Sequence, residues 1–165
     1  MPKMKFIEFS MHQENSRIIQ LTDLLAAIPN NDWSWSILDF YGVGKLLIGM
    51  SMEKFEETAR SMPGGYLFSW SELKAFAGQI EQTWDCLIVA AESKQNLIAA
   101  DLEKDNFSRC LLVLQAMDTT TWSVGAREEQ LFKNINKNFS SNFYTCGGRT
   151  NSAKNILQRG PARPL

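Results

Sequence analysis

The sequence predicts a single α+β domain, in which a mixed sheet of five or six strands packs against about four helices. Its 165 residues suffice for one domain with a buried core, and 44% hydrophobic against 21% charged residues is an ordinary globular composition. Two apolar runs, WDCLIVAA from Trp84 and CLLVLQAM from Cys110, are typical of central strands that are covered on both faces. Segments with helical spacing of apolar residues lie before and after these runs and supply the helices.

The first third of the chain predicts strand, helix and strand in turn. Residues 3–10 carry the apolar side chains of the first strand. The apolar residues of the next segment recur on one helical face, and Pro29 ends that helix. They are Ile18, Leu21, Leu24, Leu25 and Ile28. Residues 33–44, WSWSILDFYGVG, then alternate as a strand with one buried face does.

Two serines predict where the middle helices begin. Ser51 is a candidate N-cap, with Glu53 in the first turn where the helix dipole favours an acid, and Pro63 with two glycines ends that helix. Ser69 and Glu72 have the spacing of a capping box ahead of the next apolar stripe. The stripe consists of Leu73, Phe76, Ala77 and Ile80. Capping explains Ser69 and Glu72 without a catalytic role.

The segment AMDTTTWSVGA, residues 116–126, is either a reactive cluster of one acid and three hydroxyls or the corner of a hairpin. Aspartate and threonine side chains bond to nearby backbone groups and favour turns. A threonine nucleophile needs an adjacent base, often its own terminal amine, which an internal threonine lacks. We therefore expect a hairpin corner at residues 118–121. A strand from Trp122 and a helix over residues 127–139 follow it.

Charge divides the chain into an acidic body and a basic tail. Residues 1–139 carry 13 basic and 18 acidic side chains, net −5, whereas residues 140–165 carry four basic and no acidic ones, net +4. We expect residues 1–139 to form the globular domain and residues 140–165 to be a flexible tail. An acidic body lacks the basic face that nucleic-acid binding requires, and it suits a cationic protein partner.

The sequence also predicts that the protein is cytoplasmic and has no membrane partner. No apolar run approaches the roughly 18 residues that a membrane span needs, and the N-terminus alternates polar and apolar residues where a signal peptide has an apolar block. The three cysteines, Cys86, Cys110 and Cys146, agree with this location. An odd number without CxxC spacing indicates neither a disulfide framework nor a zinc site.

Few residues suggest catalysis or cofactor binding. His12 is the only histidine, which excludes multi-histidine metal sites and leaves a single possible histidine base. Residues 42–45, GVGK, lack both the spacing and the hydroxyl of a phosphate-binding loop. We therefore predict no catalytic residue, no metal site and no cofactor. Two alternatives stay open, namely a small enzyme that uses a cleft carboxylate or a Cys–His12 pair, and an intracellular adaptor.

Three longer segments resemble small bacterial α+β proteins that are encoded beside polymorphic toxins, many of which serve as immunity proteins. The segments are WSWSILDFYGVG, MPGGYLFSWSELKAFAGQIEQTWDCLIVAA and LQAMDTTTWSVGAREEQLFKNINKNF, and the resemblance covers about residues 4–139. It implies a non-enzymatic protein that neutralises a toxin domain by occluding its active site. Such proteins share no single fold and act by binding, so no active-site residues carry over.

An acidic docking surface would suit a cationic toxin domain, because complementary charge speeds encounter and fixes orientation. Candidate contact residues gather around the second predicted strand and the helix after it, where two tyrosines supply aromatic anchors. The candidates are Asp32, Asp39, Tyr41, Glu53, Glu56, Glu57 and Tyr66. The alternative for each carboxylate is an ordinary solvated position, since the i, i+4 spacing of Glu53 and Glu57 is typical of an exposed helix face.

Overall fold

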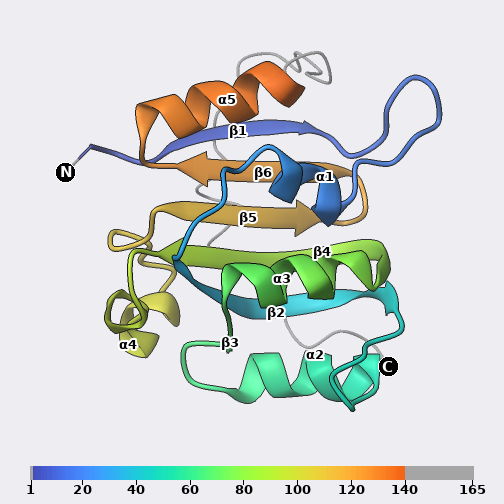
Figure 1. Cartoon of the computed structure of the whole chain (residues 1–165), viewed down its shortest axis with the longest axis vertical. Helices are drawn as coiled ribbons and strands as arrows, with labels where there is room; N and C mark the ends of the chain where they lie inside the picture. The colour runs from blue at the N-terminus through green and yellow to red at the C-terminus, as the bar shows by residue number, and fades with distance from the viewer. Residues whose placement is uncertain (1, 140–165) are drawn as a thin grey trace.

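The computed structural model describes residues 2–139, which form one six-stranded sheet with five α-helices and a 3-10 helix (Figure 1). The strands are β1 Lys5–Ser10, β2 Ser34–Gly44, β3 Tyr66–Phe68, β4 Ile80–Ala91, β5 Leu112–Met117 and β6 Thr121–Ala126. The helices are α1 Leu21–Ala26, α2 Met52–Ser61, α3 Trp70–Gly78, α4 Ala99–Leu102 and α5 Glu129–Phe139, with the 3-10 helix η1 at Lys94–Asn96. The predicted α+β class is confirmed, while the predicted tail, residues 140–165, lies outside the described residues.

The strands follow the order β1-β6-β5-β4-β2-β3 across the sheet. All five pairings are antiparallel, so the described strands contain none of the parallel pairs of a mixed sheet. The two long apolar runs became β4 and β5, which lie side by side at the centre. Their central position explains why both runs are apolar on both faces.

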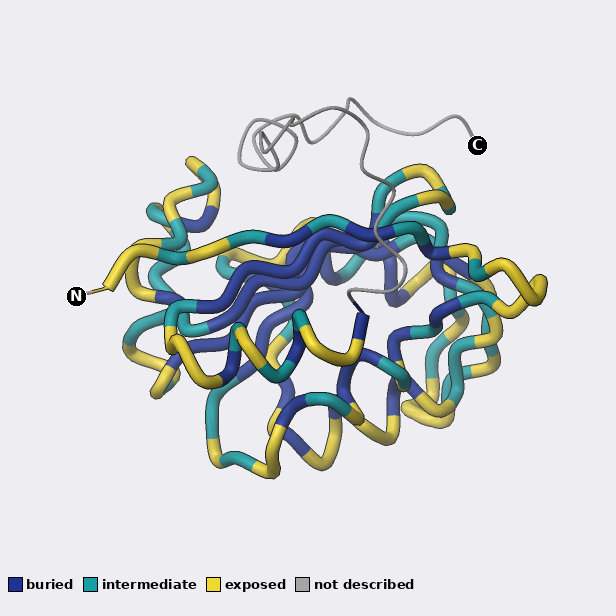
Figure 2. The backbone as a smooth tube through the Cα atoms, turned by 90° about the horizontal axis from the view of Figure 1, so that it is seen from above, coloured by how far each residue is buried: buried dark blue, intermediate teal, exposed yellow. Residues whose placement is uncertain are grey.

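One face of the sheet carries most of the hydrophobic core, and we call it the helix face. α1, α3 and α5 lie across it (Figure 1), and Phe55 reaches it from α2, which lies beside β2. Four phenylalanines interlock there with ring centroids 4.9–6.3 Å apart. They are Phe40, Phe55, Phe68 and Phe76. Figure 2 shows the buried strands as a continuous layer with the helices packed against one side.

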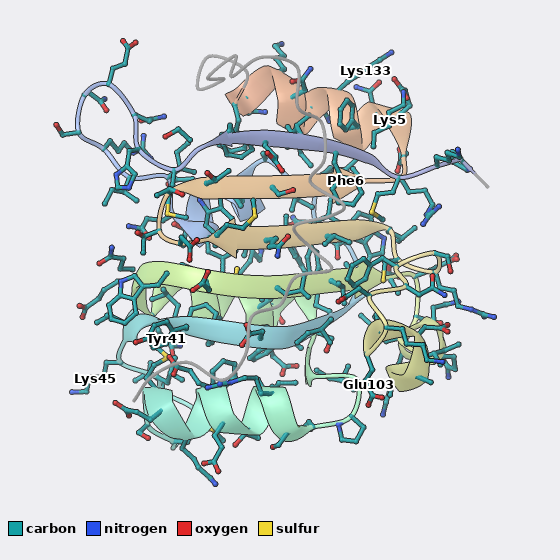
Figure 3. The ribbon with its side chains drawn as sticks, turned by 180° about the vertical axis from the view of Figure 1, so that it is seen from behind. Lys5, Phe6, Tyr41, Lys45, Glu103 and Lys133 are labelled. Atoms are coloured by element: carbon teal, nitrogen blue, oxygen red, sulfur yellow. The ribbon has the colours of Figure 1, made fainter. Side chains whose placement is uncertain are left out.

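The opposite face, which we call the back face, has a second and smaller core. Its apolar residues from β2, β4 and β5 are Leu38, Leu87, Val89 and Val113. Residues 97–110, which include α4, cover them with Leu97, Leu102, Phe107 and Cys110. Phe6 lies over the neighbouring strand β6 (Figure 3), and a Cβ atom on Gly125 would meet its ring at 2.5 Å. Gly125 therefore leaves the space that the Phe6 ring occupies against the sheet.

The predicted helix starts and hairpin corner are confirmed. Ser51 Oγ accepts a hydrogen bond from the backbone N–H of Lys54 at 3.1 Å, and Ser69 Oγ accepts one from Glu72 at 3.2 Å. Asp118 and Thr119 have φ angles of 49° and 59°, the left-handed values of a type I′ turn between β5 and β6. The acid and hydroxyls at residues 118–121 therefore build a corner.

The short strand β3 was not predicted. It consists of three residues after the Pro-Gly-Gly turn and pairs with Trp35, Ser36 and Ile37 of β2. Gly65 precedes it with a φ of 83°, and a Cβ atom there would lie 2.4 Å from Ser36 Oγ. This glycine therefore permits both the turn and the close approach of β3 to β2.

Candidate functional site

The structure separates the predicted docking residues along the length of β2. Asp32 is exposed in the loop before β2, whereas Asp39 and Tyr41 lie on the strand itself. α2 runs back along β2, since Glu56 contacts Gly42 and Arg60 contacts Asp39. This orientation places Glu53 near the C-terminal end of β2, at the opposite end from Asp32. The carboxylates therefore do not form one contiguous cluster.

Glu56 does not belong to any exposed acidic surface. Only 7% of the residue is exposed, and its Oε1 atom accepts a hydrogen bond from the backbone N–H of Gly42 at 3.2 Å. The carboxylate faces the sheet because it follows Phe55, whose ring enters the core, on the buried side of α2. Glu53 and Glu57 are exposed on the other side of the same helix, as their spacing predicted.

Asp39 and Arg60 form an ion pair between β2 and α2. The Nε atom of Arg60 lies 3.7 Å from Asp39 Oδ1, and it also donates to the backbone carbonyl of Glu56 at 3.4 Å. The aspartate is half-buried, whereas 42% of the arginine side chain is exposed. A pair of this kind contributes at most about 1 kcal/mol to stability. Asp39 thus has a structural partner inside the protein.

The two tyrosines make aromatic contacts within the chain. Tyr66 packs against Phe55 and Phe68 with ring centroids 5.2 and 5.1 Å away, at the border of the core. The Tyr41 ring meets Trp84 edge to face at 4.6 Å, at the end of the back face (Figure 3). Both tyrosines are half-buried. Each can therefore offer only part of its ring to a partner.

An exposed apolar surface lies where β2 leads into α2, and sequence analysis assigned it no role. We call it the β2–α2 corner, and its apolar members are Val43, Leu47 and Ile48. Leu47 is 79% exposed. Glu53 and Glu57 are exposed on α2, which follows this loop, and Lys45 in the loop and Lys54 on α2 are exposed as well. Only the run LLIGM between two predicted elements could have signalled it.

The loop of this corner is held in place from two directions. The backbone N–H groups of Lys45 and Leu47 donate to the carbonyl and the side-chain oxygen of Gln79, at 3.2 and 2.8 Å. Gln79 follows α3 and precedes β4, so it connects the loop to two other elements. Leu46 and Met50 pack against the core from the same loop. The exposure of Leu47 is therefore a defined feature of the fold.

The structure does not bring Cys110 and His12 together as the catalytic pair of the enzyme alternative would require. The Nε2 atom of His12 lies 2.7 Å from the backbone carbonyl of Thr119, beyond the C-terminal end of β5. Cys110 lies before the N-terminal end of this six-residue strand, so roughly 20 Å of strand separates the two groups. Burial also raises the pKa of the Cys110 thiol to about 11. It is therefore protonated and unreactive near neutral pH.

Neither of two shallow cavities on the described surface holds a pair of carboxylates. One, of about 200 Å³, is lined by Leu38, Arg60 and Glu103 among others. The second, of about 240 Å³, contains Asp23, which binds Arg17 at 2.6 Å. Ligand pockets typically measure about 300–1,000 Å³. Within residues 2–139, no group of three or more His, Cys, Asp or Glu side chains is placed to hold a metal ion.

The chain was compared with protein-family models, with curated proteins and with solved structures, and nothing matches. Among the helices of residues 2–139, none has the length and apolar character needed to cross a membrane.

Proposed function

We propose that this protein binds a cationic protein domain and occludes its active site. The proposed partner is a bacterial toxin domain, and the proposed docking surface is the β2–α2 corner. The observation that carries the proposal is the exposed Leu47 side chain, held on a fixed loop that leads into α2 with its exposed Glu53 and Glu57. The toxin as partner rests on the resemblance of the three sequence segments to immunity-type proteins.

The composition of the corner is that of a protein interface. Interfaces concentrate their binding energy in a few apolar or aromatic residues, and a polar rim surrounds these residues. Val43, Leu47 and Ile48 supply the apolar centre, and Glu53 and Glu57 supply part of the rim. Burying one leucine side chain is worth about 1.5–3 kcal/mol. The fixed loop also reduces the entropy that binding would cost.

Charge favours a basic partner over a neutral one. Residues 1–139 carry a net charge of −5, which attracts a cationic domain over several ångströms before contact. At the corner itself, Lys54 lies 3.5 Å from Glu57, and the exposed Lys45 lies in the loop, so two lysines balance the charges of Glu53 and Glu57. The acidic body therefore contributes mainly to the rate of association, while the apolar centre contributes to the lifetime of the complex.

The test is a binding measurement with the purified product of the gene adjacent to this protein's own. Leu47→Ser should weaken the affinity at least about tenfold, mainly through faster dissociation, because one desolvated contact of that size is lost. The double reversal of Glu53 and Glu57 to lysine should slow association at low salt more than at high salt.

A matched control separates local from global charge. Glu14→Lys with Glu128→Lys makes the same change in net charge with two exposed residues near β1, at the opposite edge of the sheet. Association that slows equally in both double variants would reject the corner as the charged docking surface. Unchanged affinity in Leu47→Ser would reject its apolar centre. Failure of the wild-type protein to bind the toxin domain would reject the immunity function.

A further inference from the structure

A row of polar side chains crosses the back face of the sheet. Glu8 of β1 lies opposite Ser123 of β6, and Ser123 lies opposite Gln115 of β5. Ser123 is 1% exposed and Gln115 is 7% exposed. Glu8 Oε1, Ser123 Oγ and Gln115 Oε1 are buried and have no hydrogen-bond partner within residues 2–139. We call these three residues the polar row.

Such a row is costly unless hydrogen-bond donors reach it. A buried polar atom without a partner costs about 1–3 kcal/mol, and native proteins leave few of them. Burial also raises the pKa of the Glu8 carboxyl. Two acceptor oxygens that need donors, with a serine hydroxyl between them that can donate or accept, indicate a binding surface for a donor-rich segment.

The back face around the row is acidic. Asp39 lies opposite Leu87 of the back-face core, and Asp85 lies two residues before Leu87 on β4. With Glu8, three strands thus contribute a carboxylate to this face. Among the six described strands, Lys5 is the only basic residue, and it lies on the helix face where it binds Glu129. The strands themselves therefore place negative but no positive charge on the back face, where Arg60 of α2 offsets the charge of Asp39.

We propose that the polar row and the acidic side chains around it are the docking site for this chain's own basic segment, residues 140–165. That segment has four basic and no acidic side chains, and its asparagines add further donors. Its charge of +4 complements the −5 of residues 1–139. The segment therefore offers what the polar row requires, namely hydrogen-bond donors with positive charge.

The end of the described chain lies close to the row. The ring of Phe139 stacks on Phe9 with centroids 4.8 Å apart, and Phe9 follows Glu8 on the edge strand β1. A segment that starts there has to round only this edge to reach the back face. The 26 residues after Phe139 can extend to roughly 80 Å, whereas six strands spaced about 4.8 Å apart span roughly 25 Å.

The experiment uses the full chain with a nitroxide label on Cys146. Cys86 and Cys110 are buried, so the label attaches selectively. We expect paramagnetic broadening to remove at least half of the NMR signal intensity of the Gln115 side-chain amide and the Ser123 backbone amide. Signals of exposed residues above the helix face, such as Thr22 and Ala75, should keep their intensity, and reduction of the nitroxide should restore the lost signals.

A charge-reversed variant and its control test the cause. Changing Arg149, Lys154, Arg159 and Arg163 to glutamate should abolish the broadening at Gln115 and Ser123. Reversing four exposed lysines of the body should leave it in place, with Lys45, Lys74, Lys133 and Lys137 as the control set. Gln115→Leu, which removes the acceptor, should reduce the broadening at Ser123.

Three results would overturn the proposal. Broadening that is absent, or confined to the end of α5, would show that residues 140–165 do not reach the polar row. Equal broadening in the charge-reversed variant would show that charge does not direct them. Broadening of isotope-labelled protein by a separate nitroxide-labelled copy would place the segment on another molecule. The experiment requires no toxin domain, so its outcome is independent of the proposed function.

Discussion

The backbone N–H of Gly42 donates a hydrogen bond to Oε1 of Glu56 at 3.2 Å. β3 pairs with β2 only as far as Ile37, so the outer edge of β2 beyond that residue has no neighbouring strand among the described residues. The carboxylate of Glu56 supplies an acceptor there, and the ion pair of Arg60 with Asp39 adds a second contact between helix and edge. α2 therefore protects an edge that would otherwise be open to pairing with another chain.

The bond to Gly42 predicts that Glu56 is structural. Glu56→Ala should lower the free energy of unfolding by about 1–3 kcal/mol, because it leaves a buried backbone donor unpaired. Glu56→Gln should lower it less, since the amide oxygen can still accept the bond. Glu57→Ala on the exposed side should change it by no more than about 0.5 kcal/mol. Urea denaturation of the three variants is the measurement, and equal losses at Glu56 and Glu57 would contradict the assignment.

The buried Cys110 thiol predicts a loss of stability at alkaline pH. The thiol has an ordinary pKa of 9.0, which burial raises to about 11 in the folded protein. Between these values the unfolded chain releases a proton that the folded chain retains, so stability falls as pH rises. The wild type should lose on the order of 2 kcal/mol relative to Cys110→Ala between pH 8 and pH 11. Parallel stability curves for the two proteins would show that the thiol ionises freely.

The core on the helix face predicts which truncations are most costly. Phe76→Ala and Leu112→Ala should each lower the free energy of unfolding by about 2–5 kcal/mol, because both side chains are fully enclosed. Ser69→Ala should cost about 1 kcal/mol, since it removes the hydrogen bond to the Glu72 amide. Thermal and denaturant unfolding check these values. Similar small losses in all three variants would contradict the packing described for α3 and β5.

The corner between β5 and β6 predicts a stabilising substitution. Thr119 is β-branched and has a φ of 59°, a conformation that is unfavourable for such a residue. Thr119→Gly should therefore raise the free energy of unfolding by up to about 1 kcal/mol. The backbone carbonyl that binds His12 is retained in this variant. Thr120 is not among the positive-φ residues, so the control Thr120→Gly should lower the free energy of unfolding. If the melting temperature falls in both variants, Thr119 is not strained.

Much of the fold could be predicted from sequence because its signals are local. Ser69 caps a helix through an amide only three residues away, and the hairpin corner depends on residues adjacent in the chain. The continuous apolar runs of β4 and β5 likewise indicate that both faces of these strands are buried. β3 could not be predicted because three residues are too few to show an alternation of apolar and polar side chains. Its position also depends on the close approach of Gly65 to Ser36.

The candidate site was much less accessible to sequence reasoning. Glu53, Glu56 and Glu57 look equivalent in the sequence, but only Glu56 faces the β2 edge, because its partner Gly42 lies 14 residues away. The exposure of Leu47 follows from bonds to Gln79, 32 residues later.

The sequence alone thus determined the composition, the division of charge between residues 1–139 and residues 140–165, and the elements with local sequence signals. Tertiary structure decided which polar side chains are buried, which apolar ones are exposed, and that Glu8 and Ser123 lie opposite each other. The physical reason is that hydrogen-bond satisfaction and burial depend on neighbours that are distant in the chain.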